Sequence, residues 1–205
     1  MMNPYASHYL NLVPYTTALR EQTEAVRLVR AGEKAAILLG FESESVITLG
    51  RRANAQVDLI GTLRQGVQVV EVDRGGQATL HNPGQLVIFP IAQIRAIGAR
   101  RWVEGLSEVT RLCLQEYKIE SHWHSDRPGL YTAHGKIMAC GVRLNGGIST
   151  HGVAINVCND LTDFAMIRAC GHNNQTMDRM GSNLDLAEIF TRWCQGFKTH
   201  FASIS

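Results

Sequence analysis

Apolar residues recur with the spacing of an amphipathic helix in separate segments of the chain. Residues 14–32 begin with proline and end with glycine, and the apolar positions between them fall on one face: Tyr15, Ala18, Leu19, Ala25, Val26 and Val29. Residues 102–117 repeat this pattern. A further helix is predicted over 184–201, with one buried side made of Leu186, Ile189, Phe190, Trp193 and Phe197.

Shorter apolar runs bounded by turn residues predict strands. Three of them, "AAILLGF", "SVITLG" and "VQVVEVD", occupy residues 35–41, 45–50 and 67–73. Two more, at 136–144 and 149–157, flank a glycine turn and predict a hairpin. Strands cluster between a few helices without regular β–α alternation. This order predicts an α+β fold with a mixed sheet flanked by helices, and it argues against a doubly wound nucleotide-binding fold.

Length and composition bound the class of protein. The chain has 205 residues, of which 45% are hydrophobic, and this is enough for one sizeable core. No linker interrupts it, so residues 1–205 are predicted to form a single domain. The formal net charge of +2 gives no sign of a nucleic-acid or membrane partner. Without a signal peptide or a long apolar run, we expect a cytoplasmic protein.

One cysteine is set apart from the others. The five cysteines lack the CxxC spacing of zinc or redox sites, so we expect reduced thiols that mostly fill the core. Cys170 instead precedes glycine in the loop "IRACGHNNQTM", residues 167–177. A thiol in such a loop is well placed to attack a carbonyl beside backbone donors. The alternative is an inert buried thiol.

A lysine opens an otherwise apolar strand. Burial of Lys136 at the start of "KIMACGVRL" would favour its neutral amine, which can act as a base. The alternative is that Lys136 caps the strand end with its ammonium group in water.

The segment "DRGGQATLHNPGQ", residues 73–85, combines glycines with a cation and an imidazole. It lacks the Gly-Lys-Ser/Thr of a phosphate-binding loop and the GxGxxG spacing of a dinucleotide site. Arg74 and His81 can anchor this loop by hydrogen bonds, and either can approach a reacting group. For His81, a structural role and a role in proton transfer both stay open. His122 and His124 share one face of a strand, but no third ligand is evident, so we expect no metal site.

Taken in order, the segments "RGGQATLHNPGQ", "PGLY", "GKIMACGVR", "HGVAINV" and "ACG" resemble the lipoyl(octanoyl) transferase family over roughly residues 40–177. The resemblance implies the fold shared by biotin and lipoate protein ligases. It also implies an acyltransferase of lipoate biosynthesis and protein lipoylation that works without a cofactor. Such an enzyme moves an octanoyl group from acyl carrier protein to a lysine through a cysteine thioester. The implied acceptors are the lipoyl domains of 2-oxoacid dehydrogenases and the H protein of glycine cleavage.

The family's functional residues map onto this sequence by motif. Its cysteine nucleophile and its lysine match Cys170 and Lys136. Its substrate pocket matches three segments: Arg74, Gly75, Gly76, Gln77, Ala78, Thr79, Leu80 and His81; Ala139, Cys140 and Gly141; and Gly152, Val153 and Ala154. We interpret Gly75 and Gly76 as positions where a Cβ atom would intrude on an acyl chain.

The chain departs from the family pattern at three positions. Ser43 replaces a usual histidine, Asn82 stands where glycine is frequent, and Ala169 replaces a usual proline. These differences bear on substrate choice more than on the chemistry. Two alternatives remain open: an ATP-dependent lipoate ligase, which shares the fold and the lysine but lacks the cysteine, and a non-catalytic module that binds carrier protein.

Overall fold

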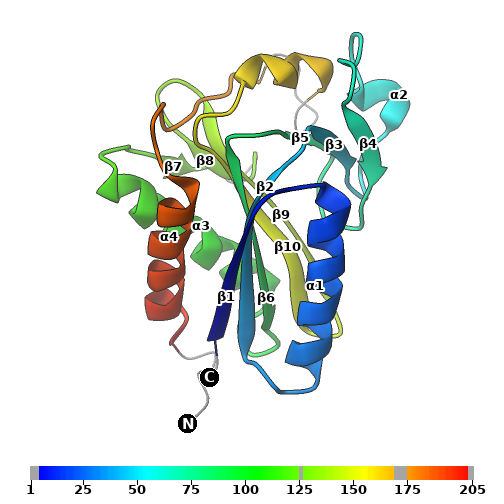
Figure 1. Ribbon diagram of the computed structural model, residues 1–205. Coiled ribbons are helices and arrows are strands. Elements are labelled where there is room, and N and C mark those ends of the chain that lie inside the picture. The colour runs from blue at the N-terminus through cyan, green and yellow to red at the C-terminus, as the bar shows by residue number, and fades with distance from the viewer. Residues whose placement is uncertain (1–4, 125–126, 169–174, 203–205) are drawn as a thin grey trace.

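A mixed seven-stranded sheet forms the centre of the protein (Figure 1). The computed structural model describes residues 5–124, 127–168 and 175–202. In spatial order the strands are β1 (Tyr5–Val13), β2 (Ala36–Ser43), β6 (Gln85–Gln93), β10 (Ile148–Asn156), β9 (Lys136–Asn145), β8 (Gly129–Tyr131) and β7 (His122–Trp123). β1 runs parallel to β2, and the other neighbours are antiparallel. The predicted mixed sheet and the predicted β9–β10 hairpin are therefore confirmed.

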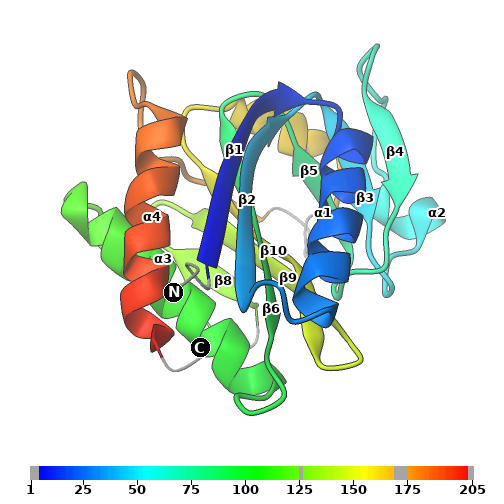
Figure 2. The ribbon, with the colours of Figure 1, turned by 60° about the horizontal axis from the view of Figure 1, so that its bottom comes forward.

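Helices cover both faces of this sheet. α1 (Tyr15–Arg30) packs on one face, while α3 (Ala99–Glu116) and α4 (Leu186–His200) lie side by side on the other (Figure 2). The predicted apolar side of α4 is confirmed, because each of its five residues is buried. α3 begins at Ala99, earlier than the predicted start, because Gly98 precedes it with the positive φ of 79°.

The strands of the large sheet read as continuous apolar runs because both of their faces are covered. Within β6, Leu86 and Ile88 belong to the core beneath α3 and α4. Val87 and Phe89 alternate with them and belong to the core beneath α1. Successive side chains of a strand point to opposite faces, so a strand between two layers of helices needs apolar residues at every position.

A smaller three-stranded sheet lies beside the large one, with strand order β4-β3-β5. Its strands are β4 (Gln68–Glu71), β3 (Val46–Leu49) and β5 (Ala78–His81), and it is accompanied by α2 (Ala55–Asp58) and the 3₁₀ helix η1 (Leu161–Met166). Ile47, Leu80 and Phe164 pack in its own apolar core. The loop between β4 and β5 carries the glycine-rich motif, so this sheet delivers that motif to the edge of the large one.

β1 was not predicted from the sequence. Its residues are half-buried and exposed in pairs along the strand instead of alternating singly, so the two-residue period that indicates a strand is absent. β1 forms because its backbone pairs with the buried strand β2, and it is an edge strand of the large sheet.

None of the described helices is both long enough and apolar enough to cross a lipid bilayer. The described cysteines carry free thiols: Cys113 and Cys194 are buried in the core, and Cys140 and Cys158 are half-buried.

Two glycines at the α4 interface predict opposite effects of the same substitution. Gly196 lies inside α4, where an added Cβ would make ordinary contact with Val109 at 3.5 Å. Gly196→Ala is therefore expected to raise the free energy of unfolding by about 0.5–1 kcal/mol, because alanine loses less backbone entropy in a helix. Gly40 lies on β2 directly beneath the ring of Phe190, which an added Cβ would enter. Gly40→Ala is expected to lower the free energy of unfolding by about 1–3 kcal/mol through overpacking.

Urea unfolding of both variants measures these changes, and an unchanged slope with denaturant shows that the folded state is preserved. A Gly40→Ala protein as stable as the wild type would contradict the packing of α4 against β2.

Candidate active site

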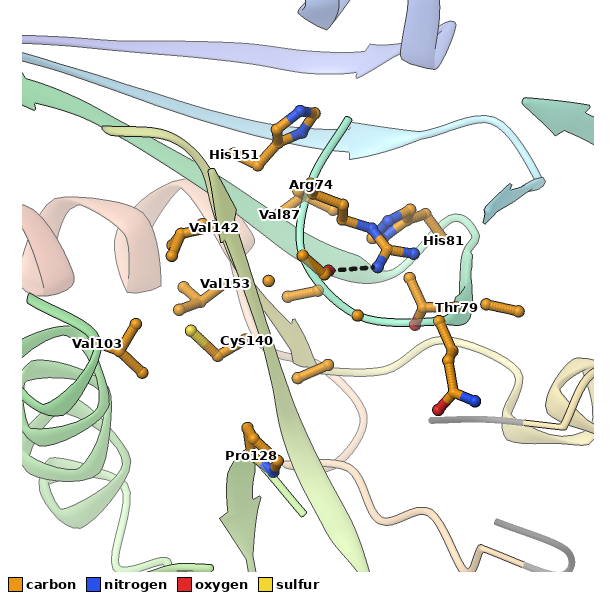
Figure 3. Close-up of a pocket in the computed structure, with 18 of the residues that line it drawn as sticks. Arg74, Thr79, His81, Val87, Val103, Pro128, Cys140, Val142, His151 and Val153 are labelled. Carbon is orange, nitrogen blue, oxygen red and sulfur yellow. Dashed lines mark hydrogen bonds between the residues drawn. The ribbon is translucent and has the colours of Figure 1, made fainter. Parts of the chain in front are cut away.

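A cavity of about 470 Å³ lies between the loop before β5 and the β9–β10 hairpin (Figure 3). Its walls combine side chains from both faces of the large sheet. Phe89 and Ala154 belong to the core beneath α1, whereas Val153 and Cys140 lie on the side of α3 and α4. Most of the wall is apolar. A cavity of this size and character fits an apolar group with a few polar contacts that fix its orientation.

The predicted pocket residues come together in this cavity, with one exception. The loop residues line it from Arg74 to Thr79 and at His81, and the hairpin lines it at 139–141 and 152–154. Leu80 does not line it, because its side chain points into the core of the small sheet and is fully buried there. Whether the lining residues bind substrate stays a prediction.

Several lining residues were not singled out by the sequence. Among them are Tyr15, Val87, Phe89, Val103 and His151. The first four follow the apolar periodicity of their helix or strand, so their pattern indicated burial and nothing more. His151 stands directly before Gly152 in "HGVAINV", and a histidine within a predicted buried strand was the available signal.

Arg74 anchors the loop instead of projecting freely into the cavity. Its side chain is buried, and one of its terminal nitrogens donates to both the main-chain oxygen and the Oγ1 of Thr48 at 2.8 Å. Its other terminal nitrogen donates to the oxygen of Gly75 at 3.0 Å, the bond drawn in Figure 3. The guanidinium therefore holds the turn of the loop against β3, since its fixed fork of donors suits several acceptors at once.

The loop lies against the backbone of β9. The amide of Gly75 donates to the oxygen of Val142 at 3.0 Å, and a Cβ on Gly141 would stand 3.1 Å from the oxygen of Gly75. Gly76 has a φ of 94°, which residues with a side chain rarely adopt. The close approach that these glycines permit is thus between loop and strand. Their proposed contact with an acyl chain stays a prediction.

His81 is a buried, neutral imidazole. Its ring stacks on Tyr15 with centroids 5.2 Å apart, and its Nδ1 lies 2.7 Å from Oε1 of Gln85. Burial lowers the pKa of His81 to about 3, outweighing the opposing effect of the hydrogen bond to Gln85. A pKa this low makes His81 a poor proton acceptor at neutral pH, so the structure favours the structural role over proton transfer.

The hydrogen bonds of Gln85 determine which nitrogen of His81 carries the proton. Nε2 of Gln85 donates to the main-chain oxygen of Leu80 at 3.3 Å and to Oδ1 of Asn156 at 2.8 Å. Both are acceptors, so Oε1 of Gln85 must accept and Nδ1 of His81 must donate. Nε2 of His81 is then a bare acceptor, and among the described residues it has no hydrogen-bond partner.

His151 joins the hairpin to the start of the loop. Its Nε2 lies 2.8 Å from Oδ1 of Asp73, and the other carboxylate oxygen pairs with Nε of Arg143 at 3.1 Å. Its amide donates to Oε1 of Gln22 on α1 at 2.6 Å. Burial lowers the pKa of His151 while the bond to Asp73 opposes that shift. Its φ of 54° is unusual for a residue with a side chain, and such strain is typical of functional sites.

Lys136 is buried with an exposed fraction of 1%, so the alternative of a strand cap in water is wrong. Its Nζ donates to the oxygen of Pro128 at 2.8 Å and lies 5.6 Å from the ring centre of Tyr131. Pro128 itself lines the cavity. The amine of Lys136 is therefore hydrogen-bonded to a residue of the cavity wall, although Lys136 does not itself line the cavity.

Cys140 places a sulfur in the cavity wall (Figure 3). Burial raises the pKa of its thiol to about 12. Cys170 and the departure at Ala169 lie outside the described residues.

The other two departures from the family pattern have structural roles. Ser43 is buried, and its hydroxyl donates to the oxygen of Glu44 at 2.7 Å. Asn82 is buried too, and its Nδ2 donates to the oxygen of Asp160 at 2.9 Å and to Oδ2 of Asp163 at 3.0 Å. Asn82 thus ties the end of the glycine-rich loop to η1.

The histidines considered for a metal lie apart from the cavity lining. His122 is exposed, and both it and His124 contact the ring of Tyr131. Within the described part of the chain, no group of three His, Cys, Asp or Glu side chains is arranged to hold a metal ion.

Known proteins resemble this chain along most of its length. The sequence profile of the lipoyl protein ligase A/B catalytic domain matches residues 14–197. An octanoyltransferase of Legionella pneumophila is 34% identical over 199 residues, covering 95% of this chain and 98% of that protein. An octanoyltransferase of Rubrobacter xylanophilus is 36% identical over 196 residues, covering 91% and 89%. The bipartite lipoate protein ligase of Thermoplasma acidophilum has the same fold, with a TM-score of 0.78 at 15% identity over 98% of this chain and 85% of that one.

The burial of His81 predicts that the stability of the fold depends on pH. Its pKa is about 3 in the folded protein and about 6.5 when unfolded. Between these values the unfolded chain binds the extra proton, so acidification through this window destabilises the fold, by up to about 1.4 kcal/mol per pH unit. His81→Phe keeps an aromatic ring against Tyr15 but cannot titrate, so this part of the slope should vanish. Urea unfolding at several pH values between about 4 and about 7 measures this slope.

His8→Gln is the matched control, because His8 is exposed on β1 and its substitution should keep the wild-type slope. Equal slopes for wild type and His81→Phe would show that the imidazole of His81 is accessible to protons in the folded state.

Proposed function

The chain belongs to the lipoyl protein ligase A/B catalytic-domain family and to the octanoyltransferases within it, and we propose that its nucleophile is Cys170. It is an acyltransferase that acts in protein lipoylation. In the proposed reaction an octanoyl group passes from acyl carrier protein to Cys170 as a thioester, and then to a lysine of an acceptor protein. The proposed acceptors are the lipoyl domains of 2-oxoacid dehydrogenases and the H protein of glycine cleavage.

The observation that carries the proposal is an apolar cavity beside a buried lysine. The cavity is large enough for an acyl chain, and the amine of Lys136 bonds to Pro128 in its wall. Met177 comes after Cys170 in the sequence, and its backbone forms an isolated parallel β-bridge with Lys136. This pairing supports a role for Lys136 and Cys170 in one reaction.

The first step transfers the acyl group to the enzyme. Lys136 acts as the base that takes the proton of the Cys170 thiol, and the sulfur attacks the carbonyl carbon of the octanoyl thioester. A new carbon–sulfur bond forms at Cys170 while the bond to the carrier sulfur breaks. The carrier leaves as a thiol after it receives the proton from Lys136, so charge and atoms balance.

The second step transfers the acyl group to the acceptor. The amine of the acceptor lysine attacks the enzyme thioester, an amide forms, and the sulfur of Cys170 leaves. Lys136 can take the proton released by the attacking nitrogen and pass it to the leaving thiolate of Cys170, which restores the thiol. One thioester replaces another in the first step and an amide replaces a thioester in the second. Neither exchange requires a nucleotide.

This last point separates the proposal from its alternatives. An ATP-dependent ligase would transfer lipoate or octanoate only with ATP, and a non-catalytic carrier-binding module would gain no covalent mass. Incubation with octanoyl carrier protein in the absence of ATP, followed by intact-mass measurement, distinguishes the three. The expected result is an enzyme whose mass rises by one octanoyl group.

Substitution of the two proposed catalytic residues is expected to have different consequences. Cys170→Ala removes the atom that accepts the acyl group, so no acyl-enzyme should form even at saturating donor. Lys136→Ala keeps the nucleophile without its base, so acylation should slow by about 10²–10⁴-fold. The rate should recover partly at higher pH, because an ordinary cysteine thiol ionises with a pKa of about 8.5. Octanoyl-enzyme formation, followed by mass across pH, measures both effects.

Cys158→Ala is the matched control, since Cys158 is a half-buried cysteine that does not line the cavity, and it should be acylated at the wild-type rate. Acylation of Cys170→Ala, or octanoyl transfer by it at a near wild-type rate, would rule out the covalent mechanism.

A further inference from the structure

Asn156, the last residue of β10, holds two main-chain oxygens together. Its side chain is buried with an exposed fraction of 2%. Its Nδ2 donates to the oxygen of Asp178 at 3.0 Å and to the oxygen of Lys136 at 3.4 Å. These oxygens belong to segments that are distant in the sequence, namely the start of β9 and the described segment 175–180.

The orientation of this amide is fixed by its surroundings. Both neighbours of Nδ2 are carbonyl oxygens, which only accept. On the other side, Oδ1 of Asn156 accepts from Nε2 of Gln85 at 2.8 Å and from Nδ2 of Asn159 at 3.3 Å. An exchange of nitrogen and oxygen would oppose like groups at all four contacts, so the amide has one possible orientation.

The two segments also pair directly with each other. The amide of Lys136 donates to the oxygen of Thr176 at 2.9 Å, and the amide of Asp178 donates to the oxygen of Lys136 at 2.9 Å. The main chain of Asn156 contributes as well, since its oxygen accepts from the amide of Met180 at 3.0 Å. The segment 176–180 is therefore held against the ends of β9 and β10, and Asn156 contacts it with both main chain and side chain.

We propose that Asn156 is a positioning residue, whose side-chain amide sets the register between the strand that begins with Lys136 and the segment that contains Asp178. The inference rests on the proposed function, in which Lys136 is the base and the segment 175–180 follows the nucleophile in the sequence. Transfer of a proton between two side chains depends steeply on their separation, so a register error at these carbonyls lowers the rate without removing a reacting atom.

Asn159 offers a matched comparison. It is buried to the same degree, and its Nδ2 also makes two hydrogen bonds, to Oδ1 of Asn82 at 2.9 Å and to Oδ1 of Asn156 at 3.3 Å. These two side-chain bonds reach neither Lys136 nor Asp178. Asn156→Ala and Asn159→Ala therefore each delete one buried amide and two donated bonds, and only the first removes the side-chain bonds to the oxygens of Lys136 and Asp178. Asn156→Ala also removes the two bonds that its Oδ1 accepts.

The expected result is a selective loss of rate in the first variant. The rate constant of acylation by octanoyl carrier protein should fall by about 10–100-fold in Asn156→Ala, a loss typical of a small misplacement of catalytic groups. The donor concentration for half-maximal rate should change by less than about threefold, because no group that binds substrate is removed. Asn159→Ala should stay within about threefold of the wild type in both quantities.

Combination with Lys136→Ala separates positioning from a general loss of structure. Register between base and nucleophile is irrelevant once the base is absent, so Asn156→Ala should cost less than about threefold in the Lys136→Ala background. An equal loss in both backgrounds would overturn the inference, as would equal rates for Asn156→Ala and Asn159→Ala. A wild-type enzyme that gains no octanoyl group would instead refute the proposed function and this inference with it.

A second variant serves if Asn156→Ala does not fold. Thr132 holds the same segment from its other side, because its hydroxyl donates to the carboxylate of Asp178. Thr132→Val removes that bond and nearly preserves the shape of the side chain, and it should lower the acylation rate in the same selective way. A folded Thr132→Val protein that is acylated at the wild-type rate would contradict the proposal that this register determines the acylation rate.

Discussion

The arrangement of the cavity depends on how closely the loop 73–77 approaches the backbone of β9. The amide of Gly75 bonds to the oxygen of Val142, and the absence of a side chain at Gly141 leaves room for the loop to settle there. This contact joins the small sheet, which carries the loop, to the large sheet, which carries the hairpin. Arg74 secures the loop from behind through Thr48, and Asp73 ties its beginning to the hairpin. A cavity between two sheets thus keeps its shape through hydrogen bonds at its rim.

The buried polar groups of the cavity wall are oriented by their own neighbours, whereas Arg52 and Arg127, which also line the cavity, are exposed. Burial lowers the pKa values of His81 and His151 and so favours their neutral forms. The donors of Arg74 are directed to oxygens of Thr48 and Gly75. An octanoyl chain carries no charge and no hydrogen-bonding groups beyond its carbonyl. The apolar side chains that make up most of the wall suit such a ligand.

Much of this arrangement could be predicted from the sequence, because the apolar periodicity and the local turn motifs that indicate it are visible along the chain. The apolar stripe of α4 and the glycine turn of the β9–β10 hairpin predicted elements that the structure contains. The mixed sheet followed from the irregular order of strands and helices. The sequence motifs also indicated the loop and the hairpin that line the cavity, although they wrongly suggested that every residue from 74 to 81 would face it. Alternation along β5 turns Leu80 to the opposite side.

What the sequence could not supply is contact between distant polar side chains. Nothing near Asn156 in the sequence reveals that its amide meets Asp178, or that Gln85 fixes the tautomer of His81. β1 was not predicted for a related reason, because it is stabilised by pairing with β2 and not by an apolar pattern of its own. The environment of Lys136 lay between these cases. Its apolar strand suggested burial, but the carbonyl of Pro128 that receives its amine is visible only in three dimensions.

The sulfur of Cys140 in the cavity wall bears on the chemoselectivity of acyl transfer. A thiol is a nucleophile only as thiolate, and with a pKa of about 12 this group is ionised in on the order of one molecule in 10⁵ at neutral pH. A thioester bound in the cavity therefore meets a sulfur that can pack against it but does not compete for its carbonyl. Burial allows the protein to use cysteine as an apolar side chain of convenient size in the wall of the cavity proposed to hold the acyl group, without diverting that group to its own wall.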